Sequence, residues 1–377
     1  MSKFAAFPVD KHVKQYDEYK FTLPELYREL AKEELREDDV VREKALTEMR
    51  YWIENNPHIR KCRMDAKFLL RFLRFRQFSV PMACEALERY LTMREIYPSW
   101  FKNLDTSNEI MKKLFMTGAT SIVGQDSNGR TIVFFRIARF VPEMFEPPTG
   151  GIFIALLIEA MLEWEEVQIG GLQVMVDYSD INLKLFEKWG SSELKLIMEA
   201  FTRWYPIRYN DTHAAKLPKK ALPVIEKILS FTNPKIRERI NCYANVSEME
   251  KHFDPTVAPK GYGGTVDLDG DINPAMWKRI EQQQDVILGL DGMEIDYDYY
   301  APIWDEQNVA LVSETPSVFI FKHLGLPILA SVTRIYHNMI VSPVFGEMVF
   351  MGCPPHNSVF INVSFNTGIA CFSYFIY

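Results

Sequence analysis

The chain has 377 residues, of which 47% are hydrophobic, so it holds enough apolar material for one large or two small buried cores. Its formal net charge of −7 excludes nucleic acid as the main partner, because proteins that live on nucleic acid are usually basic overall. The five cysteines stand far apart and form no CxxC pair, which favours reduced thiols in a cytoplasmic protein over disulfides or a zinc site. The N-terminus shows no apolar signal segment.

The first hundred residues predict a series of helices. Pro24 stands at the start of the first amphipathic stretch, and Asp38 or Asp39 can cap the second. Asp65 can cap the third stretch, and Pro81 stands in the first turn of the fourth. The pattern therefore indicates a helical N-terminal domain.

The third stretch, KFLLRFLRFRQF at residues 67–78, mixes basic and aromatic side chains. On a helix its phenylalanines form one apolar stripe, and Arg71 and Arg74 flank that stripe. This pattern favours an amphipathic helix whose arginines face solvent. A recognition helix for nucleic acid is disfavoured, because no partner helix and no zinc ligands accompany the stretch.

The pattern changes near residue 115, where strand-like and helix-like segments begin to alternate. Two β-rich runs flank a turn at residues 126–129, and a short apolar run bounded by glycines is suited to a buried strand. This alternation continues to Gly264 and predicts an α/β domain with a largely parallel sheet. The segments are the strands at 115–125, 130–140 and 171–179 and the helices at 150–168 and 191–205.

Two C-terminal segments differ from the rest of the chain. Residues 265–314 hold twelve acidic side chains against Lys278 and Arg279, which predicts a solvated acidic extension. Residues 316–377 hold only three charged side chains, yet no run there reaches about 18 uninterrupted apolar residues, so a membrane span is not expected. We assign this hydrophobic tail no structure and expect it to pack poorly on the domain.

Nothing in the sequence assembles a catalytic or metal centre. No P-loop, zinc-peptidase motif or nucleophile elbow occurs. Asp177, at the end of the buried strand, and His213, beside Asp211, are the candidates for acid–base chemistry. A hydrogen-bonded strand-end carboxylate and a structural histidine are the favoured interpretations, because no nucleophile, base and orienting group can be combined. We therefore expect no enzyme, no metal site and no cofactor.

A second basic segment lies at residues 216–239. It carries seven lysines and arginines against Glu226 and Glu238, and a short amphipathic helix runs through it. Two local basic patches on an acidic chain suggest a focused anionic target such as a phosphate headgroup. The amphipathic helix between them suits a surface that meets lipid.

Six segments occur in the order expected of CRAL-TRIO lipid-transfer proteins: FLLRFLRFRQF, NGRTIVFFRIARF, GLQVMVDYS, FTRWYPIR, NPKIRERI and APKGYGG. Over roughly residues 24–265 the chain resembles the branch of that family that includes alpha-tocopherol transfer and retinaldehyde-binding proteins and many insect relatives. The resemblance implies an all-helical N-terminal domain followed by an α/β cage that encloses one hydrophobic lipid. A mobile gate helix closes the cage in that family.

The resemblance also implies site residues. In that branch a basic cleft beside the gate binds phosphatidylinositol bisphosphates, and its positions fall on Arg76, Arg208, Lys235 and Arg239. A fifth position that is basic in that branch is Asn210 here. The expected lipid-pocket residues are Ile154, Ile158, Leu172, Val174, Ile197, Phe201 and Tyr205, and the expected gate residues are Leu222, Ile225 and Leu229.

These expectations define one function and one alternative. The chain is expected to be a cytoplasmic protein that binds a retinoid, a tocopherol or a similar lipid and transfers it between membranes, with reversible peripheral attachment through phosphoinositides. The alternative is a phosphoinositide-dependent membrane adaptor without transfer activity, which would recruit a partner through the acidic extension. The expected domains are 1–105, helical; 106–265, lipid-binding; 266–315, the acidic extension; and 316–377, the tail.

Overall fold

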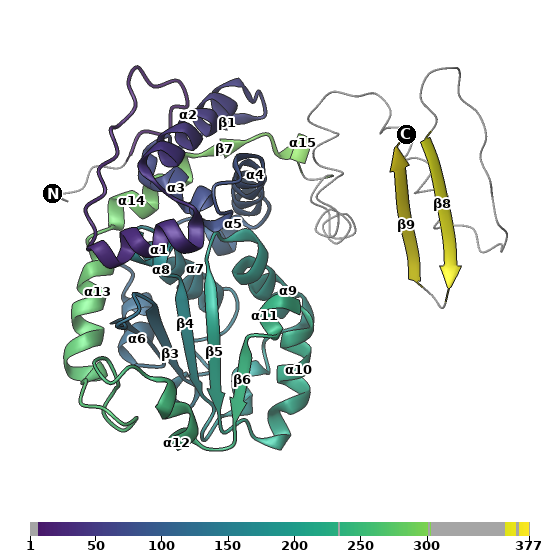
Figure 1. Cartoon of the computed structure of the whole chain (residues 1–377). Coiled ribbons are helices and arrows are strands. Elements are labelled where there is room, and N and C mark those ends of the chain that lie inside the picture. Colours follow the sequence, from purple (N-terminus) through teal and green to yellow (C-terminus); the bar gives the residue numbers. More distant parts are fainter. Residues whose placement is uncertain (1–6, 233, 301, 303–358, 367–368, 377) are drawn as a thin grey trace. The chain divides into compact units, whose positions relative to one another are not determined.

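The computed structural model describes residues 7–232, 234–300, 302, 359–366 and 369–376. The chain divides into two units, residues 1–309 and residues 310–377. The first unit contains every described element except the last two strands (Figure 1). The second contains an antiparallel hairpin of β8 (Val359–Asn366) and β9 (Ile369–Ile376). The remainder of the hydrophobic tail lies outside the described residues, so the expectation that it packs poorly stays a prediction.

The first part of unit 1 is mostly helical, as the sequence predicts. Asp38 accepts a hydrogen bond from the Val41 amide at 2.7 Å, and Asp65 accepts one from the Phe68 amide at 3.1 Å, so both predicted N-caps are present. The helices are α1 (Glu25–Leu35), α2 (Asp39–Asn55), α3 (Ala66–Phe75), α4 (Val80–Ile96), α5 (Pro98–Phe101) and α6 (Glu109–Met116).

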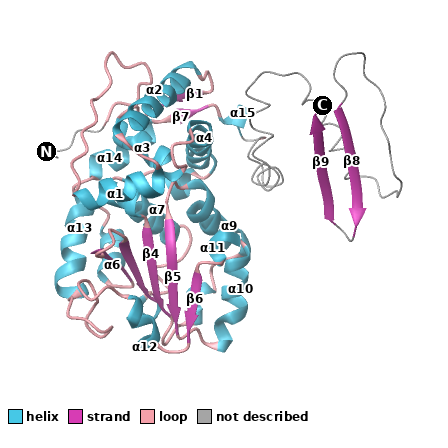
Figure 2. Ribbon diagram, viewed as in Figure 1, coloured by secondary structure: helices cyan, strands magenta, loops and turns pink. Residues whose placement is uncertain are grey.

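A five-stranded sheet follows in the order β2-β3-β4-β5-β6, and its last four strands are parallel (Figure 2). The first two strands form the predicted antiparallel hairpin. This arrangement confirms the predicted α/β class with a largely parallel sheet. The strands are β2 (Thr120–Gln125), β3 (Thr131–Arg136), β4 (Leu172–Asp177), β5 (Tyr209–Ala215) and β6 (Ile240–Tyr243).

Helices cover both faces of this sheet, because alternate strand residues enter two separate cores. Leu172 belongs to the main core, which also contains Ile158 and most of the N-terminal helices, whereas Met175 packs with Phe253 on the other face. The helices of this region are α7 (Thr149–Leu162), α8 (Glu165–Gly170), α9 (Ser191–Glu199), α10 (Leu222–Ser230), α11 (Pro234–Arg237) and α12 (Val246–Met249). Short helical turns are η1 (Ile137–Arg139), η2 (Leu183–Phe186), η3 (Ala200–Trp204), η4 (Lys219–Ala221) and η5 (Glu250–His252).

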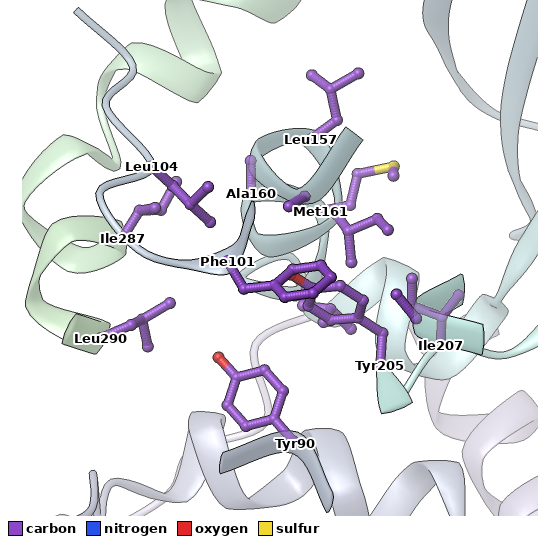
Figure 3. Close-up of a cluster of buried hydrophobic side chains, with 14 of the residues drawn as sticks. Tyr90, Phe101, Leu104, Leu157, Ala160, Met161, Tyr205, Ile207, Ile287 and Leu290 are labelled. Atoms are coloured by element: carbon purple, nitrogen blue, oxygen red, sulfur yellow. The ribbon is translucent and has the colours of Figure 1, made fainter. Parts of the chain in front are cut away.

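The segment after Gly264 is not the solvated extension that its acidic content suggests. Trp277 is 1% exposed, and Ile280, Ile287 and Leu290 are also buried in the main core. Figure 3 shows Ile287 and Leu290 facing the same cluster as Leu104 and Phe101. The prediction of a solvated segment is therefore wrong for residues 268–300, because apolar residues recur among the acidic ones and form a buried stripe. The elements are η6 (Leu268–Ile272), α13 (Asn273–Glu281), α14 (Gln284–Gly289), η7 (Leu290–Gly292), β7 (Glu294–Ile295) and α15 (Tyr297–Tyr300).

This C-terminal segment also completes the N-terminal region. Its strand β7 pairs with β1 (Ile59–Lys61), so the N-terminal region is not purely helical. Arg94 of α4 donates to Asp291 at 2.6 Å. The segment thus binds the helices at the start of the chain, although more than 190 residues separate Arg94 from Asp291 in sequence.

The arginines of α3 do not face solvent. Arg71 and Arg74 have fully buried side chains, so the expectation of solvated arginines is wrong. Arg71 donates to Glu159 of α7 at 3.1 Å and to Glu163, and Arg63 donates to the same Glu163 at 2.6 Å. Burial opposes the charge of Glu163, but the two arginines overcome it and lower the pKa of this carboxyl to about 2.

Arg74 is the centre of a second buried group. Its guanidinium makes two hydrogen bonds of 2.9 Å to Glu37 in the loop between α1 and α2. It also donates to Glu165 and Gln168 of α8 and to the hydroxyl of Tyr19. Every donor group of this side chain therefore has a partner, which is the condition under which a buried charge is tolerated.

We expect Arg71→Gln to lower the free energy of unfolding by about 3–5 kcal/mol, because it leaves Glu159 and Glu163 buried with less compensating charge. Urea denaturation of the full chain measures this loss. Lys44→Gln is the control, since Lys44 is 77% exposed and pairs only with another exposed residue. A loss below about 1 kcal/mol for Arg71→Gln would show that the network contributes little.

Candidate functional site

Six of the seven predicted pocket residues lie in the main core or pack against it. Ile158, Leu172, Ile197 and Tyr205 belong to the main core, and Ile154 and Phe201 pack against it. The prediction that Leu172, Val174 and Val176 share one face of the sheet agrees with the observed register, in which they alternate with Met175. Whether the seven residues line a lipid pocket stays a prediction.

Val174 has an unusual environment for an apolar residue of a middle strand. Its strand β4 is the middle strand of the sheet, with two strands on each side. Leu172 and Val176, which flank Val174 on the same face of β4, are buried. Val174 itself and its register partner Thr212 on β5 keep part of their surface accessible. Ile154 on α7 and Phe201 on η3 are also only partly buried. These apolar side chains are therefore only partly covered by their neighbours.

Tyr205 lies closer to the N-terminal helices than to this region. Its ring meets Tyr90 of α4 at 6.0 Å and Phe101 of α5 at 6.1 Å, both edge-on (Figure 3). It is 1% exposed, and its hydroxyl has no hydrogen-bond partner among the described residues. Its burial raises the pKa of the Tyr205 hydroxyl well above 10.

The expected gate is the helix α10, which packs against a small hydrophobic cluster. Ile225 is 7% exposed and packs with Ala221 and Ile181, while Leu229 is partly buried against the same cluster. Leu222 points outward with 38% of its surface exposed. The helix begins directly after η4, where Lys219 and Lys220 are exposed.

Arg76 caps the C-terminus of α3 and differs from Arg71 and Arg74 in having no counterion. Its guanidinium stacks on the ring of Phe75 at 4.5 Å, yet it makes no hydrogen bond or ion pair with any described residue, and its Nε is buried. Burial lowers the pKa of Arg76, and the charge of Arg89 adds to this effect while Glu85 opposes it. A buried cation without a partner is a favourable place for an anionic ligand.

Arg89, which lies near Arg76, and Arg203, which lies near Arg89, were not predicted from the sequence. Arg89 of α4 donates to Glu85 at 2.5 Å, and Arg203 of η3 lies near enough to lower the pKa of Arg89, after the larger effect of burial. They stand in helices without any basic run, so only helix packing reveals the cluster.

Arg208 and Arg239 directly precede the strands β5 and β6 and lie near enough for their charges to interact. Burial lowers the pKa of Arg208, and the charges of Arg130 and Arg239 add to the effect. Arg239 donates to the Tyr209 carbonyl at 2.6 Å. Arg208 already holds a carboxylate, since it donates to Glu34 of α1 at 2.7 Å.

The other two positions of the expected cleft add less. Lys235 is exposed on α11, in the connection between β5 and β6. The Asn210 side chain donates to the Gly170 carbonyl at 2.9 Å and so satisfies a carbonyl group at the end of α8. The convergence of Arg76 with the other three cations on one face stays a prediction.

Asp177 is a hydrogen-bonded strand-end carboxylate, as the sequence favours. It accepts from the Tyr262 hydroxyl and from the Ser179 amide, both at 2.8 Å. It lines a polar pocket of about 300 Å³ at the carboxyl ends of β3 and β4. The cations of that pocket are neutralised inside it, because Arg136 and Arg139 both pair with Asp269. The YGG segment beside it is fixed by Gly264, where a Cβ would lie 1.9 Å from the Ala258 carbonyl oxygen.

His213 is held by aromatic neighbours. Its Nδ1 lies 2.9 Å from the Tyr243 hydroxyl, and its ring stacks on His252 with centroids 4.4 Å apart. Burial lowers the pKa of His213, His252 lowers it further, and Asp211 acts in the opposite direction. This geometry supports the structural interpretation of His213.

The described part of the chain contains neither a cluster of metal-binding side chains nor a membrane-spanning helix. Among those residues, no three His, Cys, Asp or Glu side chains come together in a way that could hold a metal ion. Within the same residues, no helix combines the length and the apolar character needed to cross a bilayer.

The fold and these residues define an α/β protein with a helical N-terminal region and local cationic clusters. Residues 115–264 match the CRAL/TRIO domain, and residues 38–111 match a Pinta-like UBA domain. The chain thus contains a CRAL-TRIO domain.

Two proteins are similar to the chain in sequence, and one solved structure aligns with it. A human protein named alpha-tocopherol transfer protein-like is 27% identical over 253 residues, which are 66% of this chain and 72% of that protein. Clavesin-1 of Xenopus laevis is 28% identical over 235 residues, or 62% of this chain and 71% of that protein. The crystal structure of Sfh5 aligns at 12% identity with a TM-score of 0.42, covering 69% of this chain and 98% of that one.

The buried His213 predicts a specific loss of stability in acid. Its folded pKa lies below the unfolded value of about 6.5, so the unfolded chain binds the proton more readily. Stability therefore falls as the pH drops through about 6.5 and continues to fall until the folded pKa is reached, with a slope of at most about 1.4 kcal/mol per pH unit for this one proton.

We expect His213→Asn to show a weaker dependence of unfolding free energy on pH between about 7.5 and 5.5 than the unsubstituted chain. Urea denaturation at several pH values measures the two slopes. His12→Asn is the control, since His12 is exposed and its slope should match that of the unsubstituted chain. Equal slopes for all three proteins would remove His213 from the acid response.

Proposed function

We propose that the chain encloses one small hydrophobic lipid, such as a retinoid or a tocopherol, and transfers it between membranes. The observation that carries this proposal is that Val174, Ile154 and Phe201 are apolar yet only partly buried, with Ile154 and Phe201 packed against the main core. A site for a lipid needs an apolar wall with few polar groups, and these side chains supply one. The names of the relatives, alpha-tocopherol transfer protein-like among them, favour the same ligand class.

The packing of α10 fits this proposal. An aliphatic side chain such as Ile225 gains about 1.5–3 kcal/mol when it is buried, so closure is favoured while the interior is apolar. Bound lipid stabilises the closed state further by mass action. Neither Asp177 nor His213 is presented to such a ligand, which supports transfer rather than catalysis.

The proposal is tested by the native ligand. The full chain is purified without detergent, and its extracted lipid is identified and quantified by mass spectrometry. Transfer predicts about one small apolar molecule for each chain, whereas an empty protein would favour the alternative of a phosphoinositide-dependent adaptor. That alternative is less attractive than the sequence suggested, because residues 268–300 are packed against the main core and are not a free recruiting segment.

We infer further that Arg76, Arg208, Lys235 and Arg239 bind the headgroup of a phosphoinositide and attach the protein reversibly to a membrane in the cytoplasm. Arg76 gives the strongest support, because it is the one of the four that is a largely buried guanidinium without a counterion in the described structure. A phosphate there would form charge-assisted, partly bidentate hydrogen bonds.

Arg76→Gln should weaken binding to vesicles that contain phosphatidylinositol bisphosphate by about tenfold or more, since one hydrogen bond to a charged group is worth about 1.5–3 kcal/mol. Binding to neutral vesicles should not change. Flotation assays with both vesicle types measure the two values. Arg60→Gln is the charge-matched control, because Arg60 is exposed and pairs with Glu294 far along the chain. Equal weakening by both substitutions would reduce the effect to net charge.

Release of the lipid should depend on the lysines beside the gate. Lys219 and Lys220 each gain about 1 kcal/mol near an anionic surface, so such a membrane favours opening of α10, and salt should suppress the effect. The double substitution to Gln should slow release to anionic acceptor vesicles and leave affinity for the lipid nearly unchanged.

Stopped-flow transfer of a fluorescent lipid measures the release rate. The control is the double substitution of Lys14 and Lys44 by Gln, which removes the same charge from exposed positions of the N-terminal region. Release at the unsubstituted rate by the gate variant, or equally fast release to neutral vesicles at low salt, would contradict the proposed opening mechanism.

A further inference from the structure

Two arginines near the start of the sheet strands, Arg130 and Arg208, already have a carboxylate partner. Glu34 of α1 occupies the space between Arg130 and Arg208. Arg208 donates to its Oε2 at 2.7 Å, and Arg130 donates to both carboxylate oxygens, with the bond to Oε2 at 3.1 Å. The hydrogen bonds from Arg130, followed by those from Arg208, lower the pKa of Glu34 against the effect of its burial. One carboxylate thus holds two guanidinium groups.

Further charged groups lie near these two arginines. Arg239 is a third guanidinium close enough to affect Arg208. The hydrogen bond to Glu34 raises the pKa of Arg130 against burial, and the charges of Asp126 and Asp211 add to this effect. Asp126 also accepts from its own turn, namely from the Arg130 amide at 2.7 Å and the Asn128 amide at 3.0 Å. Oε2 of Glu34 accepts from both arginines, so one oxygen holds two guanidinium groups.

Glu34 is also able to leave. Its side chain is 30% exposed, and those of Arg130 and Arg208 are 21% and 17% exposed, so an ion from solvent reaches all three. The helix itself is anchored by other residues, since Tyr27, Ala31 and Leu35 are buried. The carboxylate can therefore rotate away without undocking α1.

We propose that Glu34 is a specificity-determining residue of the headgroup site: it acts as an internal competitor and sets the minimum charge that a ligand must carry. A phosphodiester has one negative charge, as the carboxylate has, and gains nothing by replacing it. A phosphomonoester carries about −1.5 to −2 and three acceptor oxygens, so it replaces Glu34 with a net gain. The site then accepts headgroups with phosphomonoesters and rejects lipids with a single phosphodiester charge. This inference rests on the proposed phosphoinositide site.

The test compares Glu34→Gln with Glu33→Gln on vesicles that contain phosphatidylglycerol, whose headgroup has one phosphodiester charge. Glu33 is exposed on the same helix, so its substitution removes the same net charge without touching the arginines. We expect Glu34→Gln to bind these vesicles at least about fivefold more tightly than the unsubstituted chain, and Glu33→Gln to change little. Indistinguishable binding by the two variants would overturn the proposal. Glu34→Ala provides a second test should Glu34→Gln fold poorly.

A double-mutant cycle locates the effect. In an Arg130→Gln background, Glu34→Gln should gain less than half of what it gains in the unsubstituted chain, on the logarithmic scale, because one of the two released guanidinium groups is missing. Equal gains in both backgrounds would show that Glu34 acts only through long-range charge and would overturn the proposal.

Calorimetry with soluble inositol trisphosphate distinguishes two sources of the phosphate. If Glu34→Gln binds the soluble molecule more tightly, the site recognises the headgroup alone. If Glu34→Gln binds more tightly on vesicles but not in solution, the site recognises lipid held in a membrane. Both outcomes support the role of Glu34. The underlying function can fail separately. Vesicle binding that depends on Arg76, together with no effect of Glu34→Gln, refutes only the present inference. A gain by Glu34→Gln without any effect of Arg76→Gln removes Arg76 from the site and leaves Glu34 in place.

Discussion

The ion pairs of Arg71 are the constraint on which the rest of the molecule depends. A buried guanidinium needs matching charge, and the carboxylates that match Arg71, Glu159 and Glu163, come from the end of α7, about ninety residues later in sequence. The Nε of Arg71 has no hydrogen-bond partner among the described residues, so these two ion pairs hold the side chain. The pairs therefore fix α3 against the end of α7. Tyr90 and Arg94 of α4 donate to Glu159 as well, at 2.7 Å and 3.1 Å. A small shift of either helix would break several bonds at once, so the helical region and the α/β region form one mechanical unit.

That unit determines the position of Arg76, the cation proposed to bind phosphate. Arg76 is five residues after Arg71, at the end of the same short helix, so the buried pairs set its position. The chain then turns sharply through Gln77 and Phe78, whose φ values of 48° and 60° lie in the left-handed region. Such residues cost about 1–2 kcal/mol each and persist only where the surroundings hold them. Gln77 donates to the Glu34 carbonyl at 3.0 Å, which ties this turn to the helix that carries the internal competitor.

Local sequence predicted the elements well, because helix caps and strand alternation are short-range signals. It failed where long-range packing overrode composition. The arginines of α3 were expected in solvent, although two glutamates four residues apart in the otherwise apolar α7 were a signal of buried partners. In the acidic segment, the number of charges concealed the spacing of Trp277 and Ile280. The residues of the cleft came from family resemblance rather than from local pattern. Neither local pattern nor family resemblance predicted Arg130, Arg203 and Glu34 as site residues. Their neighbours are set by helix packing and strand order.

The number of basic residues in a sequence therefore overstates the charge that a surface can offer. Of the arginines that the basic, aromatic stretch contains, Arg71 and Arg74 are neutralised inside the core, and only Arg76 lacks a counterion in the described structure. The same holds at the β5 edge, where Arg208 is held by Glu34. An acidic chain can thus present a small, discriminating cationic site, because internal carboxylates cancel most of its positive charge. A ligand succeeds there by replacing an internal partner or by filling the one vacancy, and both requirements favour a compact, multiply charged phosphate over a diffuse anionic surface.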